Sequence, residues 1–160
     1  MAQVQNVVMV LTGNSLETMF SAGGSGNWVA NASRVRRCEY IVAVRHGFSS
    51  FTQDNRTHDA AFMIGKVSGV TEVEDNRIVI NFSEYAEIDI ARAWPGNRNP
   101  VTYTSTDQLG IDPAKLTWLP FPMDRVAQPE VKPLTIDEAK RGIARALGIA
   151  PECIEITIRA

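Results

Sequence analysis

Aromatic residues stand beside amides and arginines in three short segments, and this combination can bind a planar ligand. The segments are GNWVANASRVRR at 26–37, NFSEY at 81–85 and AWPGNRNPVTY at 93–103. Aromatic rings stack on nucleic-acid bases, amides bind the base edges and guanidinium groups bind phosphate. The candidate ligand-binding residues are Trp28, Asn31, Arg34, Arg37, Ser83, Trp94, Asn97 and Arg98. We expect one pocket near Trp28 and Trp94.

The same residues also suit a purely structural role. Trp94 would then close one end of a barrel, and the asparagines would cap turns, as their short amide side chains commonly do. The sequence leaves both interpretations open.

No motif in the sequence indicates a catalytic or metal-binding site. His46 and His58 lack the spacing of a zinc site. A predicted strand separates Cys38 from His46, so we interpret Cys38 as a structural residue. The glycine-rich GGSGN at 23–27 is not followed by the Lys-Ser or Lys-Thr of a phosphate-binding P-loop. We therefore expect no catalytic residue, no metal ion and no cofactor.

Composition places the chain among ordinary globular proteins. Its 160 residues are 44% hydrophobic and 21% charged, with a net charge of −2. This charge argues against nonspecific coating of nucleic acid, which needs a basic surface. Runs such as VVMVL are too short to span a membrane. With two distant cysteines and no signal-like N-terminus, we expect a cytoplasmic protein with no membrane partner.

The first 122 residues contain the signals of a mixed fold. We expect a strand at 4–12, a short helix capped by Ser15, a second short helix capped by Ser33, and a buried strand at 40–44. A polar loop follows at 47–59. Two strands joined by a turn at 74–77 then form the clearest hairpin, in which Gly65 and Gly69 indicate bulges or bends.

The remaining residues indicate a linker and an appendage. A one-turn helix at 104–109 should stop at Gly110, and four prolines follow between 120 and 133. Thr135 and Glu138 form a capping box for a helix that ends at Gly148. CIEITI at 153–158 alternates like a strand. Because this unit cannot bury its own apolar face, it must dock on the main domain or on a partner.

The order of these pieces resembles the PUA-like superfamily of small β-barrels, which includes the EVE and ASCH families. The resemblance covers roughly residues 4–122, through GNWVANASRV before YIVAVRH, then AFMIGKVSGV and RIVINFSEYAEI. It implies recognition of nucleic acid without catalysis, including modified bases in EVE-type domains. It implies pocket residues at Trp28 and in the 94–98 neighbourhood. The C-terminal 134–160 segment resembles an ending of uncharacterised bacterial proteins.

We therefore expect an α+β protein with a small mixed or antiparallel, PUA-like β-barrel at 1–122, a proline-rich linker at 123–133 and a helix-strand appendage at 134–160. The first functional hypothesis is non-enzymatic recognition of a nucleotide or a nucleic-acid base, plain or modified. The alternative is an interaction or inhibitor module that binds a protein partner. A third is a small enzyme for a nucleotide-like substrate, with His46, Asp54 or His58 as acid or base.

Overall fold

The computed structural model describes residues 4–48, 50–127 and 133–159. The chain divides into two compact units, Met1–Ala127 and Gln128–Ala160. Residues 128–132 of the predicted linker lie outside the described residues, whereas its start at Met123–Arg125 forms the 3-10 helix η3.

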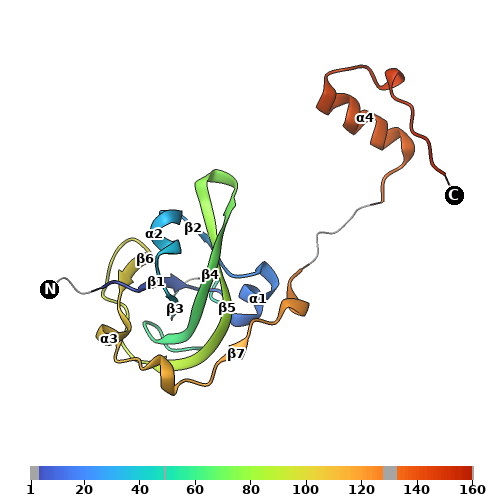
Figure 1. Ribbon diagram of the computed structural model, residues 1–160. Helices are drawn as coiled ribbons and strands as arrows, with labels where there is room; N and C mark the ends of the chain where they lie inside the picture. Colours follow the sequence, from blue (N-terminus) through green and yellow to red (C-terminus); the bar gives the residue numbers. More distant parts are fainter. Residues whose placement is uncertain (1–3, 49, 128–132, 160) are drawn as a thin grey trace. The chain divides into compact units, whose positions relative to one another are not determined.

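The first unit is an α+β domain built on one mixed sheet that curls into a half-barrel (Figure 1). The sheet order is β2-β5-β4-β3-β1-β6, with β7 paired to β5. The pair of β1 and β3 is parallel, and the other described pairs are antiparallel. The strands are β1 (Val7–Thr12), β2 (Ser25–Trp28), β3 (Tyr40–Arg45), β4 (Ala61–Val73), β5 (Arg77–Ile90), β6 (Val101–Thr104) and β7 (Leu119–Pro120).

The helices are short. They are α1 (Leu16–Ala22), α2 (Ala32–Arg36) and α3 (Thr106–Leu109) in the first unit and α4 (Ile136–Leu147) in the second, with 3-10 turns η1 (Glu74–Asn76), η2 (Pro113–Lys115), η3 (Met123–Arg125) and η4 (Pro151–Cys153). Within the described ranges, no helix combines the length and the apolar character needed to cross a membrane.

The central strands β1 and β3 are buried on both faces, which explains their nearly continuous apolar sequence. Val8 and Val10 belong to a first core cluster, which the side chains of α1 and α2 help to fill. The alternate residues Val7 and Met9 belong to a second cluster, against which Trp94 and Trp118 pack. The sheet therefore separates two hydrophobic layers.

The long β4–β5 hairpin supplies the curl. Its pairing shifts register between Lys66 and Val67 and again between Val67 and Gly69, which fits the predicted bulge near Gly69. A Cβ atom at Gly65 would lie 2.9 Å from Cγ of Phe82, so a side chain there would collide with the partner strand. The turn at η1 places Asp75 in the left-handed region, with φ of 62°.

The sequence predicted the N-cap residue correctly for two helices and wrongly for one. The side chains of Ser15 and Thr135 accept hydrogen bonds from the backbone amides of Thr18 and Glu138, as predicted. The second helix is capped by Asn31, two residues before the predicted Ser33, because the Asn31 amide oxygen reaches the Arg34 amide at 3.0 Å. The predicted strand at 153–158 pairs with no strand in the described chain.

Candidate functional site

A pocket of about 460 Å³ lies where β1, β2 and two loops meet. Its wall is mainly apolar and carries two ionisable side chains, His46 and Arg98. The lining residues are Leu11, Thr12, Gly13, Asn14, Gly26, Trp28, His46, Phe51, Arg98 and Pro100. Four segments distant in sequence thus contribute to one concave site.

Trp28 forms one wall at the end of β2. Its indole Nε1 donates a hydrogen bond to Oγ of Ser25 at 3.0 Å, and its half-buried ring packs against the first core cluster. The glycine-rich stretch before it has a packing role: a Cβ at Gly26 would lie 2.7 Å from Cγ2 of Val79 on β5. The glycines therefore let β2 approach β5 and present Trp28 to the pocket.

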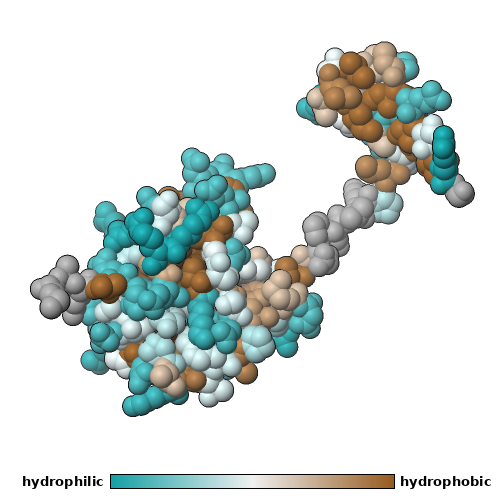
Figure 2. Space-filling model, in the orientation of Figure 1, coloured by the Kyte–Doolittle hydropathy of each residue, from teal (hydrophilic) through white to brown (hydrophobic). Residues whose placement is uncertain are grey.

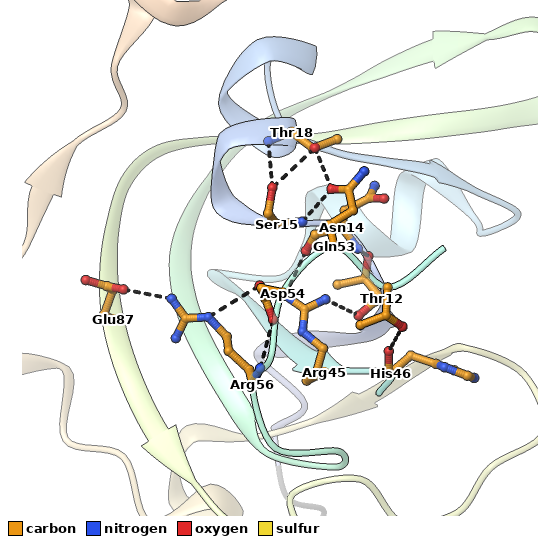
Figure 3. Close-up of polar contacts among 11 residues, drawn as sticks. Thr12, Asn14, Ser15, Thr18, Arg45, His46, Gln53, Asp54, Arg56 and Glu87 are labelled. Atoms are coloured by element: carbon orange, nitrogen blue, oxygen red, sulfur yellow. Dashed lines mark hydrogen bonds and ion pairs between the residues drawn. The ribbon is translucent and has the colours of Figure 1, made fainter. Parts of the chain in front are cut away.

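A buried arginine holds Thr12 and Asn14, two residues of the pocket lining, in place (Figure 3). Arg45 ends β3 and is fully buried. Its Nη1 donates to the carbonyl of Thr12 at 2.7 Å, and its Nη2 donates to the carbonyl of Asn14 at 3.0 Å and to Oδ2 of Asp54 at 2.6 Å. Burial lowers the pKa of the Arg45 guanidinium, and the Asp54 carboxylate opposes this shift. Arg45 thereby ties the end of β1 to the 47–59 loop.

That loop is anchored further by hydrogen bonds to the end of β1 and the start of α1. The amide of Gln53 donates to the carbonyl of Gly13 at 2.9 Å, and the side-chain oxygen of Gln53 accepts from the amide of Ser15 at 2.8 Å. Oγ1 of Thr52 donates to the carbonyl of His46 at 2.6 Å. These contacts place Phe51, which is 71% exposed, directly over Gly13.

The rings of His46 and His58 lie edge to face, with their centroids 5.8 Å apart. His46 lines the pocket, but its Nδ1 is buried without a hydrogen-bond partner among the described residues. His58 accepts at Nδ1 from the amide of Gly47 and lies 3.1 Å from Asp59, whereas Asp54 pairs with Arg45. Within the described ranges, no three metal-ligating side chains gather.

Two of the predicted site residues, Trp28 and Arg98, line the pocket together. Asn31 caps α2 and lines a second, more polar pocket of about 440 Å³ with Arg36 and Arg77. Ser83 is exposed on β5, where its backbone carbonyl accepts from the amide of Phe121.

Arg34 and Arg37, which the sequence suggested as ligand-binding residues, lie on the surface of the α2 region. The guanidinium of Arg34 lies 3.6 Å from the ring centroid of Tyr103, a cation–π contact, and Arg34 also donates to Oε1 of Gln5 at 2.8 Å. Burial raises the pKa of Tyr103, and the Arg34 charge opposes this shift. Arg37 is exposed at the C-terminal end of α2. Neither arginine is among the residues that line the Trp28 pocket.

The structure separates Trp94 from Trp28, although the sequence suggested one pocket near both. Trp94 packs against the second core cluster, and its Nε1 donates to the carbonyl of Asn97 at 3.3 Å. Asn97 in turn donates to Oγ1 of Thr102 at 2.9 Å. These contacts fit the structural interpretation of Trp94, whereas Arg98 follows in the same loop and reaches the Trp28 pocket.

Cys38 is buried, and its thiol donates to the carbonyl of Arg34. Burial raises the pKa of this thiol, while the charges of Arg34 and Arg37 oppose the shift. A raised pKa leaves less of the reactive thiolate at neutral pH, which agrees with a structural cysteine.

Sequence reasoning missed Phe51 and Asn14 as pocket residues and gave Arg45 no role. A signal existed for Arg45, because a charged residue that directly ends a buried apolar strand requires a partner. Phe51 had a weaker signal as an aromatic residue in a polar loop. Asn14 looked like an ordinary turn residue, and only the folded position of the turn brings it to the pocket.

Comparison with protein-family models, with curated proteins and with solved structures returned no match. The site therefore has to be interpreted from its own geometry.

Proposed function

We propose that this protein binds a nucleotide or an exposed nucleic-acid base in the pocket beside Trp28, without catalysing a reaction. One observation carries the proposal: two aromatic residues, Trp28 and Phe51, and the basic Arg98 line the same concave site. Aromatic rings bind the faces of bases, and a guanidinium binds phosphate oxygens.

The pocket's size and polarity support this ligand class. Its volume of about 460 Å³ lies within the range of roughly 300–1,000 Å³ that is typical of small-molecule sites. The indole N–H of Trp28 is already bonded to Ser25, so the rest of the ring provides apolar surface. Asn14 supplies an amide, whose Nδ2 makes a long 3.4 Å contact with the carbonyl of Gly26. Such a group can turn to a base edge.

Arg98 supplies the charge for a phosphate. It is exposed, and none of the ion pairs among the described residues includes it. Binding a phosphate there would not require an existing salt bridge to break. The curled sheet is consistent with a small barrel, and the PUA-like resemblance of residues 4–122 adds modified bases to the candidate ligands.

A second candidate function is binding of a protein partner. It is favoured by the exposure of two aromatic residues in one loop, since Phe48 is 83% and Phe51 is 71% exposed. Exposed aromatic residues are common anchors of protein interfaces. In this case Phe51 would serve the partner rather than a base.

Tryptophan fluorescence tests the first proposal. In a Trp94→Phe/Trp118→Phe background, Trp28 is the remaining indole. Titration with short oligonucleotides, plain and base-modified, at two salt concentrations should give saturable quenching that weakens with salt. Substituting Phe51→Ala should weaken binding by about 1–3 kcal/mol, the usual value of one base–aromatic stack. Arg98→Ala should weaken it and reduce the salt dependence.

A matched control is Arg92→Ala, which removes an exposed arginine from the same 91–100 loop but not from the pocket lining. It should leave the affinity nearly unchanged. Absence of quenching up to high micromolar oligonucleotide, or equal effects of the Arg98 and Arg92 substitutions, would contradict base binding in this pocket.

A further inference from the structure

The second unit exposes most of its apolar side chains. Within residues 133–159, Ala144 is the one buried hydrophobic residue, at 2% exposure. Figure 2 shows apolar residues gathered on the visible face of this unit. The large exposed ones are Leu134, Ile136, Ile143, Leu147, Ile149 and Ile158. A unit with so small a core requires a covering surface.

The helix contributes one apolar stripe to this surface. Ile136, Ile143 and Leu147 recur at helical spacing on α4, and they are 51%, 43% and 65% exposed. A helix of 12 residues is marginally stable by itself in water, so packing of its apolar face has to contribute. The capping hydrogen bond of Thr135 and the left-handed Gly148 define the ends of the helix but do not cover that face.

The residues after η4 have the alternating pattern of a β-strand. Ile154, Ile156 and Ile158 alternate with Glu155, Thr157 and Arg159, the period of a strand with one apolar face. No strand of the described chain pairs with residues 154–159. An extended segment of this kind is a template for pairing with another chain.

We propose that the second unit binds the second unit of another copy of this chain, with residues 155–159 of the two copies paired as antiparallel strands about Thr157. In this register Glu155 of one copy lies opposite Arg159 of the other, so the two-fold symmetry creates two such pairs. Ile156 lies opposite Ile158 on the other face, and the apolar stripes of the two α4 helices cover that face.

Charge pairing favours this register over the alternative registers of the same two segments. Moving the two-fold centre to Ile156 or Ile158 would place Thr157 opposite a charged residue and leave no Glu–Arg pair. A parallel pairing in register would place Glu155 against Glu155, which is destabilising. A shift by one residue would place isoleucines opposite charged residues. In the antiparallel register about Thr157, opposite charges pair on one face and isoleucines pair on the other.

The remaining charges of the unit are compatible with self-association. Residues 133–159 contain four basic and four acidic residues, so their net charge is zero and two copies do not repel each other. The acids of α4 lie in its first turn, at Asp137 and Glu138, whereas Arg145 lies in its last turn. An antiparallel pair of these helices therefore places opposite charges at each end.

The proposal does not depend on the function of the Trp28 pocket, because it uses residues 133–159 alone. Size-exclusion chromatography with multi-angle light scattering on the full chain tests it. Across a concentration series, the wild-type mass should approach twice the 17.6 kDa of one chain. Glu155→Arg alone and Arg159→Glu alone should each weaken dimerisation about tenfold, because each substitution reverses a charge in both symmetric pairs.

The charge-swapped variant Glu155→Arg/Arg159→Glu should restore the dimer, which also shows that the single variants fail by charge rather than by misfolding. Glu152→Arg, a charge reversal outside the paired residues, is the matched control and should remain dimeric. A wild-type chain that stays monomeric, as it would if the unit docks on its own first unit or awaits a different partner, overturns the proposal. A dimer that is insensitive to both single reversals, or that the swap does not restore, also overturns it.

Discussion

Replacing Asp54 by Asn tests how the pocket wall is held. The substitution preserves the shape of the side chain and its ability to accept the Arg56 amide, but it removes the charge that faces buried Arg45. The guanidinium keeps two backbone carbonyls, and its Nε has no partner among the described residues. The carboxylate is therefore the main compensation for burying this charge.

The magnitude follows from that geometry. Removing one partner of a fully buried ion pair costs about 3–5 kcal/mol. Asp54 is 26% exposed and the two carbonyl contacts persist, so we expect a smaller loss of stability than this, about 2–3 kcal/mol. This is a large share of the stability of a typical domain, about 5–15 kcal/mol. The free energy of unfolding should fall accordingly.

Urea unfolding followed by tryptophan fluorescence measures the effect, because all three tryptophans lie in the first unit. Glu84→Gln is the matched control. It neutralises the Lys66–Glu84 pair, whose side chains are 38% and 41% exposed, and should cost less than about 1 kcal/mol. Arg45→Met/Asp54→Asn removes both charges and should recover part of the loss. If Asp54→Asn costs no more than Glu84→Gln, the assignment of Arg45 as the anchor of the pocket wall is refuted.

Two further substitutions probe the strand and the thiol behind the site. Gly26→Ala should destabilise the first unit by about 1–3 kcal/mol, because its Cβ would lie 2.7 Å from Val79. Gly142→Ala on α4, where an added Cβ meets nothing within 4 Å, should not be destabilising. Thermal unfolding compares the two variants, and equal effects would contradict the packing role of Gly26. Alkylation followed by mass spectrometry should modify exposed Cys153 well before buried Cys38. Since burial raises the pKa of Cys38, the folded state favours the neutral thiol. The resulting stabilisation of the folded state is present below the ordinary thiol pKa and is lost as the pH rises through the raised pKa of Cys38. Cys38→Ala should therefore reduce the loss of stability at alkaline pH, and an unchanged profile would contradict the assignment.

Local signals in the sequence predicted the regular elements well. Caps such as Ser15 and Thr135, and the left-handed stop at Gly148, act within one turn of helix and can be recognised without knowledge of the fold. The β4–β5 hairpin was equally legible, since its turn and alternation are local. By contrast, β2 and β6 are four residues each and exist only because distant strands pair with them.

The candidate site was less predictable because one loop divides its residues between two faces. Trp94 and Arg98 are four residues apart, yet Trp94 packs against the second core cluster and Arg98 lines the Trp28 pocket. The amide of Leu11 donates to the carbonyl of Pro100 at 2.8 Å, which draws the end of this loop to β1. No local pattern encodes that contact. Phe51 reaches the pocket through the equally nonlocal Arg45–Asp54 pair.

The most direct test of the central claim is a two-dimensional ¹H–¹⁵N NMR titration of the full chain with nucleoside monophosphates and short oligonucleotides. Binding in the pocket predicts saturable shifts of the Trp28 indole N–H and of the backbone amides of Gly13, Gly26, Phe51 and Arg98. The Trp94 indole, held by Asn97 on the other core cluster, should move little. Shifts confined to the Trp94 side, or no shifts at saturating ligand, would contradict the account.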